Sequence, residues 1–180
     1  MRPQSAALGK AVAARRAGQL HEALQHRNAA LALCGADEGD ERADGLRELG
    51  ELARANHDLP AAQVHYEEAV RLLRTSEDRL KLAHTVRHLG DVHAAQQRWP
   101  EAEGCLREAL DICRKEPSCA TLAVAQLDLA NTIRAYAALM SETARREQAR
   151  SLWTEAGSFY QAFGIAAGVA ECRRRAAEPA

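Results

Sequence analysis

Small and large apolar residues recur along the chain at spacings of three and four, the period of an amphipathic helix. One unit has Ala, a bulkier residue four positions on, and Ala again three positions after that. These units start at Ala23, Ala62, Ala102 and Ala149, so successive units lie 39, 40 and 47 residues apart. A second helical pattern precedes the last three units: Leu46-x2-Leu49-Gly50-x2-Ala53, Val86-x2-Leu89-Gly90-x2-His93 and Ile133-x2-Tyr136-Ala137-x2-Met140. The sequence therefore predicts a series of helix pairs.

The turns inside the pairs also repeat. Asp58-Leu59-Pro60 and Arg98-Trp99-Pro100 occupy equivalent places, which puts Pro in the first turn of the second helix, where its missing N–H costs nothing. Gly18-Gln19-Leu20 is the corresponding turn of the first pair. The small residues are expected to let neighbouring helices approach closely, while the bulkier residues fill the remaining core: Tyr66, Leu106 and Trp153.

This pattern resembles the tetratricopeptide repeat, which has Leu-Gly in its first helix and Ala, an aromatic residue and Ala in its second. The long period is similar to that of kinesin light chain repeats. The resemblance implies an all-α, right-handed α-solenoid of about four such pairs plus a C-terminal capping helix. We expect one array over 1–180, with repeats at 5–34, 40–75, 77–115 and 118–160 and the cap at 165–177. Repeat one departs from the pattern, because Arg27 stands where an aromatic residue is expected.

The composition agrees with a helical chain and argues against nucleic acid and membranes as partners. Apolar residues make up 47% of the chain but aromatic residues only 4%, a mix that favours helix over sheet. The formal net charge of −1 offers no global attraction to nucleic acid or to a membrane surface. Five scattered cysteines without a Cys-x-x-Cys pair indicate reduced thiols, and no stretch has the length of a membrane span. We therefore expect a cytoplasmic protein that binds neither nucleic acid nor membrane.

One column of charged residues stands out when the first helices are aligned. It consists of Arg47, Arg87 and Arg134, flanked three positions earlier by Asp44, His84 and Asn131 and four positions later by Glu51, Asp91 and Ala138. In the tetratricopeptide family this face lines the peptide-binding groove, so the resemblance nominates these residues as a ligand surface. Arginine suits it chemically, because a guanidinium can bind a carboxylate with two hydrogen bonds.

A second interpretation of the column stays open. Arg47 with Glu51, and Arg87 with Asp91, have the i,i+4 spacing of ion pairs that only neutralise one another on a solvated helix. Arg134 has no acidic residue at that spacing.

His84, His88 and Asp91 fall on one helix face with metal-ligand chemistry, but such spacing is common in helices. No Glu follows the first His and no Cys is near, so groove-lining or solvated side chains are the preferred interpretation, and no metal or cofactor is expected. The sequence contains no nucleophile elbow and no glycine-rich phosphate loop, which argues against an enzyme.

The function that the sequence favours is a protein–protein interaction scaffold or adaptor, with a peptide or protein segment bound in the concave groove. An acidic segment would suit the arginine column. The alternative is a self-associating structural module without a dedicated peptide ligand, so the sequence allows a monomer or a homodimer.

Overall fold

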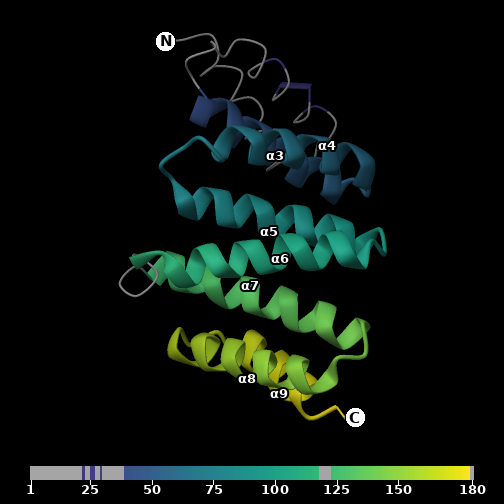
Figure 1. Cartoon of the computed structure of the whole chain (residues 1–180), viewed down its shortest axis with the longest axis vertical. Coiled ribbons are helices and arrows are strands. Elements are labelled where there is room, and N and C mark those ends of the chain that lie inside the picture. Colours follow the sequence, from purple (N-terminus) through teal and green to yellow (C-terminus); the bar gives the residue numbers. More distant parts are fainter. Residues whose placement is uncertain (1–21, 23–24, 27–28, 30–38, 118–122, 179–180) are drawn as a thin grey trace. The chain divides into compact units, whose positions relative to one another are not determined.

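A computed structural model of the chain describes residues 22, 25–26, 29, 39–117 and 123–178. Seven helices span its continuous stretches: α3 (Gly39–Ala55), α4 (Leu59–Leu73), α5 (Arg79–Ala95), α6 (Trp99–Lys115), α7 (Ala123–Glu142), α8 (Arg146–Ala162) and α9 (Ala166–Ala176) (Figure 1). No described residue lies in a strand, and the predicted all-α class is confirmed. The predicted first repeat, 5–34, and its turn at Gly18 fall outside the described residues except for 22, 25–26 and 29, which are helical.

The chain divides into two compact units, unit 1 (Met1–Asp78) and unit 2 (Arg79–Ala180). In unit 1, α3 packs against α4. In unit 2, α5 packs against α6, α7 lies against both α5 and α6, and α8 packs between α7 and α9 (Figure 1). None of the described helices combines the length and the apolar character that crossing a membrane requires.

Four of the turns between packed helices have the same backbone geometry. In the first, the amide of Asp58 donates to the carbonyl of Ala53 at 2.9 Å and that of His57 to the carbonyl of Arg54 at 3.0 Å, which is a Schellman motif. Equivalent bond pairs close the turns after α5, α7 and α8. Each motif contains one residue with positive φ, near +60°: His57, Gln97, Ala144 and Gly164.

The residue after each positive-φ position occupies the N-cap position of the next helix. The carboxylate of Asp58 accepts a hydrogen bond from the amide of Ala61 at 3.0 Å, and Pro60 follows in the first turn. Arg98 is the equivalent cap before Pro100. One tight turn thus ends one helix and starts the next, which explains why the two helices of a pair pack antiparallel and close together.

Small residues let the paired helices approach. A Cβ atom on Gly50 would lie 2.7 Å from the ring of the buried Tyr66, and one on Gly90 would lie 2.9 Å from Cγ of Leu106. In the third pair Ala137 takes the glycine position and is fully buried. The Leu-Gly element of the first helix is therefore a packing requirement imposed by the bulky residue of the second helix.

The pair α8–α9 continues this pattern in a way that the sequence interpretation missed. Gly157 precedes the positive-φ residue Gly164 by seven positions, as Gly50 precedes His57. A Cβ atom on Gly157 would lie 3.2 Å from Cβ of Cys172 on α9. Helix α8 is thus both the second helix of one pair and the first helix of another.

Trp153 lies at the centre of the unit 2 core with 1% of its surface exposed. Its indole N–H donates to the hydroxyl of Ser141 at 3.2 Å, so its polar atom is satisfied inside the core. Trp99 is partly buried against the same core. Both tryptophans therefore have a packing role, as their repeat positions indicate.

Candidate functional site

The predicted site residues come from the first helix of each described pair. Asp44, Arg47 and Glu51 lie on α3 of unit 1, His84, Arg87 and Asp91 lie on α5 of unit 2, and Asn131 and Arg134 lie on α7 of unit 2. Because α5 packs against α7, the unit 2 residues share one helical surface. We call this set of α5 and α7 residues the α5–α7 surface.

On α3, Arg47 is engaged within its own helix. Its Nη1 donates to Oε1 of Glu51 at 2.6 Å, and both side chains are partly exposed. Asp44 is partly buried one turn earlier. The i,i+4 ion pair that the spacing suggests is therefore formed.

On α5, Arg87 is almost buried, with 9% of its side chain exposed. Its Nη1 donates to Oδ2 of Asp91 at 3.2 Å, and its Nη2 lies 3.0 Å from Nε2 of His88. Nη1 and Nη2 are therefore engaged within α5, whereas the buried Nε has no hydrogen-bond partner. Arg87 is much less accessible than its place in the column suggests.

On α7, Arg134 pairs with a residue of another helix, which the i,i+4 spacing within α7 could not predict. Its Nη1 lies 3.6 Å from Oε1 of Glu171 on α9, and the two side chains are 38% and 36% exposed. Beside it, the hydroxyl of Tyr160 donates to Oδ1 of Asn131 at 2.7 Å. The end of the α5–α7 surface is thus joined to α8 and α9.

Burial shifts the pKa values of two groups near Arg134, the phenol of Tyr160 and the thiol of Cys172. It raises the pKa of Tyr160, and the nearby Arg134 charge opposes that shift. Burial also raises the pKa of the Cys172 thiol, with the charge of Glu171 acting in the same direction. Both shifts favour the neutral forms, a phenol and a thiol.

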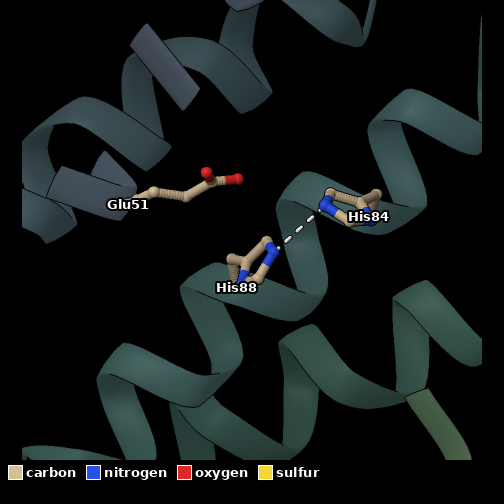
Figure 2. Close-up of side chains that lie close together, drawn as sticks. All are labelled: Glu51, His84 and His88. Atoms are coloured by element: carbon tan, nitrogen blue, oxygen red, sulfur yellow. Dashed lines mark hydrogen bonds between the residues drawn. The ribbon is translucent and has the colours of Figure 1, made fainter. Parts of the chain in front are cut away.

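His84 connects α5 to α7. Its Nδ1 lies 3.2 Å from Oδ1 of Asp128, a residue that the sequence interpretation did not select. Its Nε2 lies 3.1 Å from Nε2 of His88, and the two rings meet edge to face with centroids 4.6 Å apart (Figure 2). The available signal for Asp128 was its position one helical turn before Asn131 on the same helix.

A separate concavity on α6 carries balanced charge. Its walls contain three basic and three acidic side chains: Arg79, Arg107, Lys115, Glu108, Asp111 and Glu116. This balance gives it no preference for an anionic or a cationic ligand. The α5–α7 surface is the better candidate, because its polar groups converge from several helices.

Comparisons with known proteins rest on structure. No family model and no curated protein matches the sequence. BtubC (BKLC) from P. vanneervenii superposes with a TM-score of 0.74 at 18% identity, over 86% of this chain and 61% of that one. The apo form of RapI gives 0.80 at 11% identity over 90% and 57%, and a chain of the APC/C Cut9–Hcn1 hetero-tetramer gives 0.73 at 18% identity over 97% and 30%.

The chain therefore spans about three fifths or less of each of these proteins. All three contain tetratricopeptide repeats, and at such low identity their likeness concerns the fold. Together with the repeated helix pairs and turns, this likeness shows that the chain has the tetratricopeptide-like α-solenoid fold.

Proposed function

We propose that this chain is a non-enzymatic protein-interaction module that binds a peptide or protein segment on the first-helix faces of its repeats. The proposal rests mainly on Arg134, whose side chain is 38% exposed and whose Nη1 lies 3.6 Å from Oε1 of Glu171. This distance is longer than a good charge-assisted hydrogen bond, which is about 2.7–2.9 Å. Arg134 can therefore exchange Glu171 for the carboxylate of an acidic segment.

The energetic balance supports such an exchange. An exposed ion pair is worth less than about 1 kcal/mol, so leaving Glu171 costs little. A carboxylate that approaches Arg134 in the plane of the guanidinium gains two hydrogen bonds. Since α7, α8 and α9 hold the surrounding groups in place, only the partner loses substantial conformational freedom on binding.

The three arginines of the column are expected to contribute unequally. Arg134 is the accessible contact, and Arg47 is held by Glu51 but is still partly exposed. Arg87 is nearly buried beside Asp91 and His88 and acts chiefly by holding that part of α5 in shape. A ligand carboxylate should therefore depend most strongly on Arg134.

The described surface gives less support to the alternative, a self-associating module. Within the described residues, Val64 and Val124 are the large hydrophobic side chains that are exposed. They lie in different units, on α4 and α7. Stable homodimers usually bury a contiguous apolar patch, and two single valines do not make one.

Comparative affinity capture tests the proposal. Wild-type protein and the single variants Arg134→Ala and Arg47→Ala are used as baits at physiological salt. The control bait carries Arg71/Arg74/Arg150→Ala, three exposed arginines outside the column. We expect the control to recover the same partners as wild type, Arg134→Ala to lose most of them and Arg47→Ala to recover them more weakly than wild type. Equal recovery by all four baits would show that the column is not the binding surface.

A further inference from the structure

His84 and His88 bring two imidazole nitrogens into direct contact on α5. The residues lie one turn apart on α5, and their Nε2 atoms are 3.1 Å apart (Figure 2). The carboxylate of Asp128 can only accept a hydrogen bond, so the proton on Nδ1 of His84 is the one it receives, at 3.2 Å. A neutral His84 therefore presents a lone pair at Nε2.

Arg87 indicates which ring nitrogen of His88 carries a lone pair. A guanidinium can only donate, and Nη2 of Arg87 lies 3.0 Å from Nε2 of His88. This nitrogen of His88 therefore also presents a lone pair. The lone pair of His88 accepts from Arg87 in this arrangement, and once Arg87 moves aside both Nε2 atoms can bind one added cation, a proton or a metal ion.

We propose that His84 and His88 form a two-histidine binding site for a divalent transition metal ion of the class that prefers imidazole, such as Zn²⁺. Two nitrogens that each lie about 2.05 Å from a tetrahedral zinc ion are about 3.3 Å apart. The observed separation of 3.1 Å is close to that value, so the two nitrogens already have the spacing that binding one ion requires. Water completes the coordination.

The group behind the ring of His84 matches that of a metal-binding histidine. A ligating histidine normally donates its second ring N–H to a carboxylate or carbonyl, which fixes the tautomer and orients the ring. Asp128 on α7 has this position behind His84. Oδ2 of Asp91 lies 3.8 Å from Nδ1 of His88, which is beyond hydrogen-bond distance. All four residues belong to unit 2, whereas Glu51, also drawn in Figure 2, belongs to unit 1 and is not required.

Arg87 is the competitor of the metal ion. To use the lone pair of His88, the ion must displace Nη2 of Arg87, which retains its hydrogen bond to Asp91 at 3.2 Å through Nη1. Its positive charge also repels the ion. The site is therefore expected to bind metal more weakly than a site without such a neighbour, and Arg87 sets that affinity.

The first test follows the histidine rings directly. Untagged full-length protein is titrated with Zn²⁺ while long-range ¹H–¹⁵N NMR reports each ring nitrogen, because the five cysteines of the chain can also bind zinc. We expect the Nε2 signals of His84 and His88 to shift together, and His84→Gln or His88→Gln to lower the affinity of this step at least tenfold. The control variant His65→Gln, on α4 of unit 1, should leave it unchanged. Unmoved signals of both rings would overturn the proposal.

The second test changes Arg87 and Asp128, the residues that contact the two histidines. Zn²⁺ bound non-specifically to surface histidines would not depend on them. Arg87→Gln is expected to raise Zn²⁺ affinity severalfold because it removes the competing cation. Asp128→Asn should lower the affinity by roughly tenfold to a hundredfold, the usual effect of losing such a carboxylate. Melting curves recorded with a chelator show whether each variant is folded. Folded variants with wild-type affinity at both positions would contradict the proposed site.

Discussion

At the scale of single residues, the turns between helices place residues with side chains in the left-handed backbone conformation, which is unfavourable for them. Among the described residues, three of the four positive-φ positions hold a residue with a side chain, His57, Gln97 and Ala144, and the fourth is Gly164. The left-handed conformation costs an L-residue about 1–2 kcal/mol, and glycine avoids this cost. Alanine offers no side-chain hydrogen bond in return, so position 144 is the clearest place to measure the cost.

We predict that Ala144→Gly stabilises the protein by about 0.5–1 kcal/mol, which is the relief of strain less the larger entropy of glycine in the unfolded chain. Urea unfolding followed by circular dichroism measures this difference. The matched control is Ala95→Gly, at the exposed last residue of α5, which should be destabilising by up to about 1 kcal/mol. If both substitutions lower stability, the turn at 144 is not strained.

Glycines in two helices have opposite roles, and this difference gives a second prediction. Gly50→Ala should destabilise the protein by about 1–3 kcal/mol, because the new Cβ would lie 2.7 Å from the buried ring of Tyr66. Gly104→Ala should instead stabilise α6 by about 0.5–1 kcal/mol, since nothing lies within 4 Å of a Cβ there. Thermal melting compares the two variants. Similar shifts in both would mean that close approach does not control position 50.

At the scale of helices, Glu103 joins three elements. It accepts two hydrogen bonds from Arg145, at 2.9 and 2.7 Å, and thereby links α6 to the turn between α7 and α8. It also pairs with Arg107 on its own helix, and the hydroxyl of Tyr136 on α7 lies 3.5 Å away. The hydrogen bonds from Arg145 are the main reason that the pKa of Glu103 lies below its ordinary value of 4.5.

This shift predicts a defined pH dependence for Glu103→Gln. Since the folded-state pKa is lowered, the contribution of the ion pair is complete above about pH 4.5 and is lost as the pH falls through the folded-state value. We expect the variant to be about 1 kcal/mol less stable than wild type at pH 7, with the difference shrinking on acidification. Denaturant titrations from pH 7 to pH 3 measure it. The exposed pair of Glu68 with Arg71 serves as the control, because Glu68→Gln should cost less.

The elements differ in how far the sequence determines them. Helix pairs and their turns were predictable because Pro60, Pro100 and the small residues act within a few positions of one another. The contacts of Arg134 with Glu171 and of His84 with Asp128 were not, because each joins residues about forty positions apart on different helices. The double role of α8 was hidden for a related reason, since Gly157 shows its meaning only once the turn at Gly164 is recognised as another Schellman motif.

At the scale of the whole molecule, the division into two units has consequences for how the chain unfolds. Each unit contains its own packed helices, α3 with α4 in unit 1 and α5 to α9 in unit 2. In repeat proteins stability is approximately a sum of local terms and nearest-neighbour terms. A destabilising substitution in one part of such an array should therefore lower the stability of the adjacent helices most.

Trp153→Ala tests this expectation. Removing a fully buried tryptophan costs about 3–5 kcal/mol, a large share of the stability of a typical small protein. Because Trp153 belongs to the unit 2 core, we predict that hydrogen exchange accelerates most in α7, α8 and α9, whereas the amides of α3 and α4 keep most of their protection. Trp99→Ala, at a partly buried position of the same core, should produce a smaller change. An equal loss of protection across both units would instead mean that the chain unfolds as a single cooperative body.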